Sequence, residues 1–305
     1  MDTAQLKEEI VRLKKEKNVL ILAHTYQIPD VLDIADVTGD SYALSVAATK
    51  YDAPTVLLCG VRFMAETVKI LSPEKKVILS EVFAGCPMAL QIAPERVAEY
   101  RKEHPDHAIV TYINTTAKLK AECDVCVTSS TAVKIVSRLP QKDILFIPDQ
   151  NLGAYVAAQL PEKNIILWDG YCFVHARVTA DDVQEAKKLH PQAKVAAHPE
   201  CVAEVLALAD MVGSTSAIID YALKTEGEVI LVTERGVGDY LSREYPERSF
   251  IQLVPDKLVC KNMKMTDLQS VHNALTGAGG YEIKMDEELR LRAKRSIDNM
   301  LSIGG

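Results

Sequence analysis

Three of the seven cysteines lie at matching distances from the ends of three predicted strands. The offset is 60 to 62 residues, and the pairs are His24 with Cys86, Tyr112 with Cys172, and His198 with Cys260. Three equivalent thiolates suit a [4Fe-4S] cluster with three irons held by protein and the fourth left open as a Lewis acid. Zinc held by three cysteines and a water is the alternative, and the threefold symmetry of the cube favours the cluster.

The other four cysteines have a simpler interpretation. Cys59 and Cys201 fall in or beside apolar segments and are expected to be buried. Cys123 and Cys126 form a C-x-x-C pair, which by itself is typical of a redox or metal site. The equivalent positions around Asp36 and Asp210 carry no thiol, so we interpret this pair as structural as well.

Hydroxyl groups recur in the same register as the cysteines. An aspartate comes 12 residues after each strand end, and a hydroxyl comes 5 residues later. The aspartates are Asp36, Asp124 and Asp210, and the hydroxyls are Ser41, Ser129 and Thr215, the last with Ser214 before it. At a predicted helix start a hydroxyl can cap the helix and, with the free backbone amides, can also bind an anion. Three such places predict a substrate with several carboxylates or a phosphate.

Titratable side chains stand where the predicted strands end. The candidates for proton transfer are Tyr26, Tyr112, His175 and Glu200, with His24 and His198 beside them at repeat positions. Glu200 is expected to act as a general base or to orient a histidine. Three further histidines lie in polar stretches and are interpreted as surface residues: His104, His107 and His190.

A threefold internal repeat must position these residues. Each copy alternates short strands with helices, as in Asn18–Ala23, Ala43–Thr49, Thr55–Leu58, Phe63–Leu71 and Val77–Leu79 of the first copy. The pattern predicts an α/β fold of three pseudo-threefold-related three-layer α/β/α domains, each with a small parallel sheet, around a central active site. The expected domains are 1–87 with 265–305 packing back on the helix Thr3–Lys17, then 88–173, then 174–264.

Composition excludes several classes of protein. The net charge of −7 argues against a nucleic-acid-binding surface. No apolar run approaches the roughly 18–20 residues that cross a bilayer, and the charged amino-terminal segment cannot form a signal peptide. We therefore expect a cytoplasmic protein with reduced thiols, no membrane contact and no nucleic-acid partner.

Several separated motifs occur in one order along the chain. The most specific are Trp168–His175 and Cys260–Lys264, and the supporting ones are Gly39–Ser41, Gly85–Met88, Pro148–Gly153 and His198–Glu200. Together they resemble quinolinate synthase, the iron–sulfur enzyme family of de novo NAD biosynthesis. Thr25 departs from the family pattern, because an aromatic or amide residue is more usual between this histidine and tyrosine.

The resemblance implies condensation of iminoaspartate with dihydroxyacetone phosphate to quinolinate, with loss of phosphate and water. It implies that Cys86, Cys172 and Cys260 ligate the cluster and that Tyr26 and His175 take part in proton transfer. The implied substrate contacts are His24, Ser41, Tyr112, Ile113, Asn114, Ser129, His198, Pro199, Glu200 and Thr215 with the neighbouring Ser214. An aspartate oxidase or dehydrogenase is the implied supplier of iminoaspartate.

Three other functions compete with this interpretation. The nearest is another [4Fe-4S] hydro-lyase that acts on a polycarboxylate and needs no phosphorylated partner. A non-enzymatic iron–sulfur protein would need a fourth protein ligand, and the repeat offers none. A metal-free α/β binding protein would leave the three cysteines in register unexplained.

Overall fold

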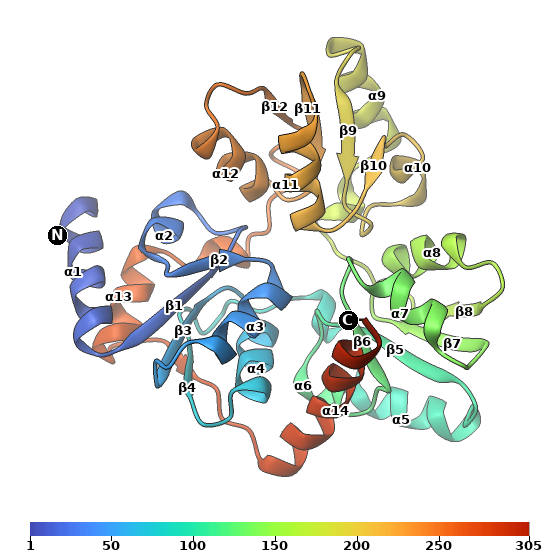
Figure 1. Ribbon diagram of the computed structural model, residues 1–305, viewed down its shortest axis with the longest axis horizontal. Coiled ribbons are helices and arrows are strands. Elements are labelled where there is room, and N and C mark those ends of the chain that lie inside the picture. Colours follow the sequence, from blue (N-terminus) through green and yellow to red (C-terminus); the bar gives the residue numbers. More distant parts are fainter. Residues whose placement is uncertain (305) are drawn as a thin grey trace. The chain divides into compact units, whose positions relative to one another are not determined.

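The computed structural model describes residues 1–304, and its strands form three small sheets flanked by helices (Figure 1). The first sheet has the order β13-β4-β3-β1-β2. Its strands are β1 (Val19–His24), β2 (Val37–Gly39), β3 (Thr55–Cys59), β4 (Lys76–Leu79) and β13 (Tyr281–Glu282). All of its pairings are parallel except that of β13, an antiparallel edge strand contributed by a distant part of the chain.

The second and third sheets repeat the four parallel strands of the first. Their orders are β6-β5-β7-β8 and β10-β9-β11-β12, which match β2-β1-β3-β4 strand for strand. The strands are β5 (Ala108–Tyr112), β6 (Val125–Val127), β7 (Asp143–Ile147), β8 (Asn164–Leu167), β9 (Lys194–Ala197), β10 (Met211–Val212), β11 (Val229–Val232) and β12 (Phe250–Gln252). The predicted α/β class with a small parallel sheet in each repeat is therefore confirmed.

Each repeat contains one strand and one short helix more than predicted. The extra strands are β2, β6 and β10, and the extra helices are α2 (Pro29–Ile34), α6 (Ala117–Lys120) and α10 (Ala203–Leu206). All six elements are 2 to 6 residues long. Segments this short carry too few residues to show a hydrophobic period.

The repeat aspartates have a structural role. Asp36, Asp124 and Asp210 each accept a hydrogen bond through Oδ2 from a backbone N–H of the first strand of their own repeat, at 2.8, 2.8 and 2.9 Å. Each aspartate also donates its own N–H to the carbonyl of that same strand residue. These paired bonds start the second strand in register, and this accounts for the constant spacing.

The other helices cover the sheets and connect the repeats. They are α1 (Thr3–Glu16), α3 (Ser41–Lys50), α4 (Arg62–Leu71), α5 (Pro94–Glu103), α7 (Ala132–Arg138), α8 (Gln150–Gln159), α9 (Ala180–Leu189), α11 (Thr215–Lys224), α12 (Gly236–Glu244), α13 (Leu268–Thr276) and α14 (Glu287–Gly304). A single 3-10 turn precedes α5, α9 and α13: η1 (Met88–Leu90), η2 (His175–Arg177) and η3 (Met263–Met265). No helix among residues 1–304 is both long and apolar enough to cross a bilayer.

By compactness the chain divides into two units. One comprises Met1–Cys86 and Cys260–Leu291, and the other comprises Pro87–Val259 and the residues from Arg292 onward. The second and third repeats thus share one unit, and the three domain boundaries expected from the sequence stay a prediction.

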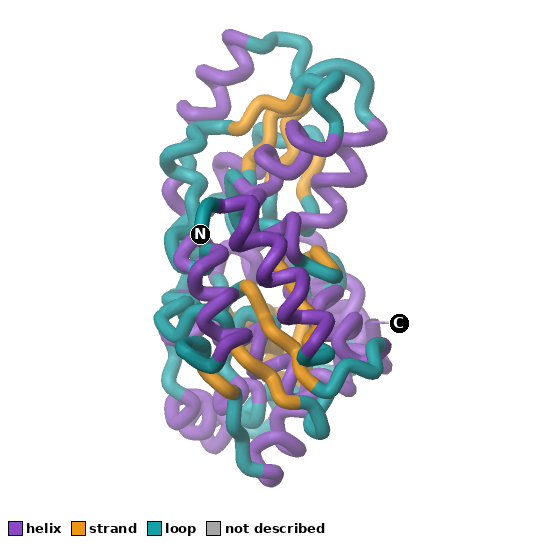
Figure 2. Tube along the Cα trace, turned by 90° about the vertical axis from the view of Figure 1, so that its left-hand side faces the viewer, coloured by secondary structure: helices purple, strands orange, loops and turns teal. Residues whose placement is uncertain are grey.

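Helices α1 and α13 cover one face of the first sheet. Leu6, Ile10 and Leu13 of α1 follow a helical spacing and join one apolar core with Val271 and Leu275 of α13 and with residues of β1 and β3. Figure 2 looks onto this side of the chain and shows helices in front of the strands. The expected return of the helix that begins near residue 266 onto the amino-terminal helix is confirmed.

The expectation that the last helix packs there too is wrong for most of its length. Asn299 of α14 donates to the carbonyl of Asp124 at 2.7 Å, and Oγ of Ser296 lies 3.3 Å from Sγ of Cys126. The carboxyl-terminal part of α14 therefore packs on the second repeat. Asp124 precedes β6, a strand that the sequence did not reveal, so this packing surface was not predictable.

Candidate functional site

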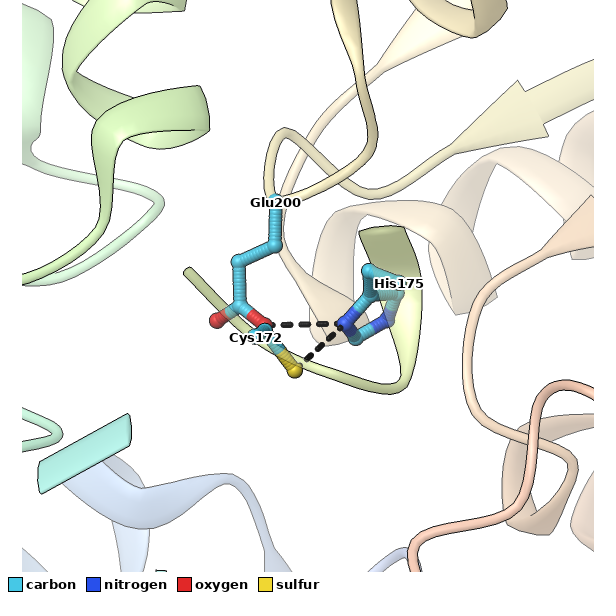
Figure 3. Close-up of side chains that lie close together, drawn as sticks. All are labelled: Cys172, His175 and Glu200. Atoms are coloured by element: carbon cyan, nitrogen blue, oxygen red, sulfur yellow. Dashed lines mark hydrogen bonds and ion pairs between the residues drawn. The ribbon is translucent and has the colours of Figure 1, made fainter. Parts of the chain in front are cut away.

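The loops after the strands of the second and third sheets carry most of the predicted site residues. Tyr112 ends β5, His198 follows β9 directly, and Cys172 lies in the loop after β8. All three stand at carboxyl ends of parallel strands, where such sheets bind ligands. These loops bring together Cys172, His175 and Glu200, which come from two different repeats of one compact unit (Figure 3).

The loop that carries Cys172 is fixed through its backbone. The N–H of Cys172 donates to Oδ2 of Asp149 at 3.0 Å, and Oδ1 of the same carboxylate caps α8 by accepting from the N–H of Leu152 at 2.8 Å. Gln91 pairs with Tyr171 in both directions, since its Oε1 accepts from the N–H at 2.7 Å and its Nε2 donates to the carbonyl at 3.1 Å. The thiol of Cys172 is therefore held on a preorganised loop.

Glu200 orients the ring of His175. Nδ1 of His175 lies 2.8 Å from Oε2 of Glu200 and 3.4 Å from Sγ of Cys172 (Figure 3). Nε2 of the same ring lies 3.2 Å from Oγ1 of Thr233. An ionised carboxylate only accepts hydrogen bonds, so Nδ1 carries a proton, and in the neutral ring Nε2 accepts from the Thr233 hydroxyl. A carboxylate that fixes the tautomer of a histidine is a common arrangement in acid–base catalysis.

Burial and neighbouring rings set the charges of this cluster. Burial alone would raise the pKa of Glu200, but His198, His175 and the hydrogen bond from His175 outweigh it, so the net pKa lies below its usual range. Burial and the charge of Glu200 together raise the pKa values of the Cys172 thiol and the Asp149 carboxyl well above their ordinary values. A cation at the Cys172 sulfur would favour the thiolate and so offset both effects.

His24 and His198 share one local geometry in two different repeats. Each ring accepts a backbone hydrogen bond at Nδ1 from the residue two places on, Tyr26 at 3.1 Å and Glu200 at 3.3 Å. In a neutral ring the proton then lies on Nε2, which becomes a donor. His198 also stacks on His175 with ring centroids 4.6 Å apart. The same backbone bond thus favours, in both repeat histidines, the tautomer with the proton on Nε2.

None of the three repeat hydroxyls occupies the N-cap position of a helix. Ser41 and Thr215 are the first residues of α3 and α11, whereas Ser129 lies three residues before α7. The residues at the N-cap position are Asp40, Thr131 and Ser214, of which Asp40 and Ser214 accept from a backbone N–H at 2.9 and 3.3 Å. The alternative that Ser41, Ser129 and Thr215 are capping residues is therefore wrong. Ser214, predicted as a substrate contact, has a capping role.

Three further predicted contacts follow β5 and β9. Ile113 and Pro199 are buried, and the N–H of Ile113 donates to the carbonyl of Val127 at 2.8 Å. Asn114 keeps part of its surface exposed between its buried neighbours Ile113 and Thr115. Among these three residues, Asn114 is the one whose side chain remains accessible to a ligand.

The predicted site residues of the first repeat lie in the other compact unit. His24 ends β1, and the ring of Tyr26 meets it edge-on with centroids 4.5 Å apart. Nζ of Lys264 donates to the carbonyl of Tyr26. Cys86 and Cys260 both belong to this unit and both keep part of their surface exposed.

The seven cysteines fall into two groups, as the repeat predicts. All are free thiols, and the three in register, Cys86, Cys172 and Cys260, are partly exposed, whereas the other four are buried. Two of the buried thiols donate to main-chain carbonyls: Cys123 to Leu119 at 3.1 Å and Cys201 to Val232 at 3.7 Å. The thiols that remain accessible are therefore the three in register, and cysteine thiolates are the usual ligands of iron–sulfur clusters.

A second metal-binding arrangement is also present. One ligand atom each from Cys172, His175 and Glu200 lies within 4.8 Å of the others, close enough to hold a single ion. To ligate through Nδ1, His175 would have to lose the proton that it shares with Glu200. The hydrogen bond between His175 and Glu200 therefore competes with metal binding through Nδ1.

Sequence reasoning missed three residues that support this site. Asp149 falls inside the Pro148–Gly153 motif, but only the fold shows that it binds the Cys172 loop. Gln91 and Thr233 lie 80 and 58 residues away from the groups that they contact, and neither position has a sequence signal. Contacts over such separations follow from sheet packing, which a single sequence does not reveal.

Known proteins match this chain over its whole length. The family model described as Quinolinate synthetase A protein matches residues 8–302. A quinolinate synthase of Caldicellulosiruptor bescii is 48% identical over 305 residues, which is 100% of both chains. Those of Clostridium acetobutylicum and Methanoregula boonei are each 48% identical, over 98% and 99% of both chains respectively. With the repeat, the three accessible cysteines and the Glu200–His175 pair in place, these matches show that the chain belongs to the quinolinate synthetase A family.

Proposed function

We propose that this protein is a quinolinate synthase that condenses iminoaspartate with dihydroxyacetone phosphate and releases phosphate and water. Family membership over residues 8–302 supports the reaction, and the buried Glu200–His175 pair beside Cys172 is the structural observation that carries it. Closure of a pyridine ring from these substrates requires several proton transfers and loss of water, which an oriented histidine assists. A cytoplasmic location and an aspartate oxidase or dehydrogenase as supplier belong to the same proposal.

The proposed cofactor is a [4Fe-4S] cluster held by Cys86, Cys172 and Cys260. The support is their common repeat position and their exposure, in contrast to the four buried thiols. When bound, the cluster supplies an open iron that acts as a Lewis acid toward a substrate oxygen.

The protein's own residues supply binding and proton transfer. His24 and His198 donate from Nε2 to substrate oxygens, because Nδ1 of each ring is engaged by the backbone. Ser41, Ser129 and Thr215 bind the carboxylates or the phosphate near helix starts. Glu200 keeps His175 in one tautomer, and the Tyr26 and Tyr112 hydroxyls are the remaining proton donors.

The test is anaerobic turnover together with cluster content. Purified protein given dihydroxyacetone phosphate and freshly generated iminoaspartate should form quinolinate, detected by mass. Cys86→Ala, Cys172→Ala and Cys260→Ala should each lose iron, whereas Cys59→Ala, Cys123→Ala, Cys126→Ala and Cys201→Ala should keep it. A reconstituted cluster without quinolinate formation would reject the reaction and favour another hydro-lyase.

A single metal ion at Cys172, His175 and Glu200 is the second candidate, favoured by their proximity. The two possibilities differ in which variants lose metal. If His175→Ala and Glu200→Ala lose all metal while Cys86→Ala and Cys260→Ala retain it, the single-ion site is correct. Measurement of iron, sulfide and zinc in the same preparations identifies the metal directly.

A further inference from the structure

A lysine is wholly buried beneath one of the proposed substrate loops. Lys120, the last residue of α6, has no exposed surface and is among the largest of the fully buried side chains. Its Nζ donates to the carbonyl of Ile113 at 2.7 Å and to the carbonyl of Thr115. Lysine is almost never fully buried unless its ammonium group is satisfied, so this arrangement calls for a reason.

The corresponding loops of the first and third repeats are held without a lysine. In the first, the N–H of Tyr26 donates to Nδ1 of His24 at 3.1 Å, and the N–H of Gln27 donates to the carbonyl of His24 at 2.9 Å. In the third, the same two bonds join His198 to Glu200 and Cys201, at 3.3 and 3.0 Å. A histidine ring and a tight backbone turn therefore fix both loops.

The second loop is built differently. Tyr112 replaces the histidine and has no ring nitrogen to accept the backbone bond. In the other two turns the acceptor is the carbonyl of the histidine, whereas here the N–H of Thr115 donates to the carbonyl of Ile113 at 2.8 Å, one residue further along the chain. At the place of Lys120, eight residues past the strand end, the other repeats have Leu32 and Leu206. The lysine thus occurs in the one repeat that lacks the histidine.

We propose that Lys120 is a positioning residue, which takes over the role of the missing histidine and fixes the loop Tyr112–Thr115. The inference rests on the proposed function, in which Tyr112 and Asn114 contact substrate. Because the ammonium group of Lys120 binds two carbonyls of this loop, it restricts the conformations of the loop. Tyr112 and Asn114 are then already oriented when the substrate binds. Oγ1 of Thr115 is buried without a hydrogen-bond partner among residues 1–304, so the Thr115 side chain does not add a bond that holds the loop.

The direct test measures amide exchange in the loop and does not depend on the reaction. Lys120→Met is unbranched and only one atom shorter but removes the donors, and exposed Lys118 of the same helix provides the matched control Lys118→Met. In Lys120→Met, hydrogen–deuterium exchange of peptides covering residues 112–116 should accelerate by about tenfold or more, the effect of losing bonds from a charged donor. Peptides covering residues 24–27 and 198–201 should exchange as in wild type.

The functional readout is the split between KM and kcat at full cluster content. We expect KM for a substrate to rise about tenfold or more in Lys120→Met with iron content unchanged, and Lys118→Met to match wild type. Unchanged exchange at 112–116, or faster exchange with unchanged kinetics, would overturn the inference. If wild type makes no quinolinate, the proposed function fails, and the exchange result still decides whether Lys120 fixes the loop.

A second variant guards against a folding defect. Lys120→Leu introduces the residue that the other two repeats carry at this place. If Lys120→Met is insoluble, a soluble Lys120→Leu with fast exchange confined to residues 112–116 supports the inference. Insolubility of both variants would show that Lys120 supports the whole repeat, and the proposed local role would be wrong.

Discussion

Asp149 makes two hydrogen bonds that join helix α8 to the loop of Cys172, so its removal should affect both. Oδ1 caps the helix through Leu152, and Oδ2 accepts from the N–H of Cys172. Loss of an N-cap costs about 1 kcal/mol, and loss of the bond to the part-buried N–H of Cys172 costs about 0.5–1.5 kcal/mol. Asp149→Ala should therefore lower the free energy of unfolding by about 1.5–2.5 kcal/mol.

The effect should depend on pH in a direction set by the same group. Burial and the charge of Glu200 raise the pKa of Asp149 in the folded protein, so ionisation of this carboxyl is harder there than in the unfolded chain. Wild type therefore gains stability from Asp149 most fully below about pH 4, and the gain shrinks as pH rises toward the folded pKa. The difference between wild type and Asp149→Ala should be smaller at pH 7 than at pH 4.

The assay is urea unfolding of the metal-free protein, with Asp267→Ala as the matched control. Asp267 caps α13 by accepting from the N–H of Ser270 at 2.7 Å, and it is exposed. This variant should lose about 1 kcal/mol, the value for a cap alone. Equal losses in the two variants would refute the reasoning, because they would show that the bond to Cys172 contributes nothing.

Three further outcomes are expected. The pKa of Glu200 is lower in the folded protein than its unfolded value of about 4.3, so the ionised carboxylate stabilises the fold above that pH and this contribution is lost on acidification. In urea unfolding, the stability of Glu200→Gln should therefore fall less steeply below about pH 4 than that of wild type. Ser214→Ala should cost about 0.5–2 kcal/mol of stability, because Ser214 caps α11. Thr215→Ala should instead lower kcat/KM by about tenfold or more and leave the melting temperature little changed. The reverse pattern would contradict the roles assigned to the two residues. Ile10→Ala should cost about 2–5 kcal/mol, because Ile10 of α1 is wholly buried in the core that α1 forms with α13 and the first sheet. A loss below about 1 kcal/mol would contradict that packing.

The repeat could be predicted from spacing alone because spacing reflects fixed bonds. Asp36, Asp124 and Asp210 recur at one distance from the strand ends since each pairs with a fixed residue of the first strand. The strand ends themselves were predicted to within one residue in β1, β5 and β9. Local hydrogen bonds and short apolar runs leave a clear trace in a sequence.

The roles of the hydroxyls were less predictable. Ser41, Ser129 and Thr215 share a spacing, but the residues at the cap positions are their neighbours Asp40, Thr131 and Ser214. Several adjacent residues can cap a helix, and which one does so depends on backbone angles within one turn. The pattern therefore located the helix starts without assigning the side chains.

The sequence by itself determined the threefold α/β repeat, the three cysteines in register and the four thiols that are buried. Each of these follows from residue types at regular intervals, which reflect burial and strand pairing within one repeat. Only the tertiary structure decided which groups support the site: Asp149 on the Cys172 loop, Glu200 on His175, and Lys120 under Tyr112–Thr115. These contacts depend on how separate strands and helices pack, and packing brings together side chains that no interval in the chain relates.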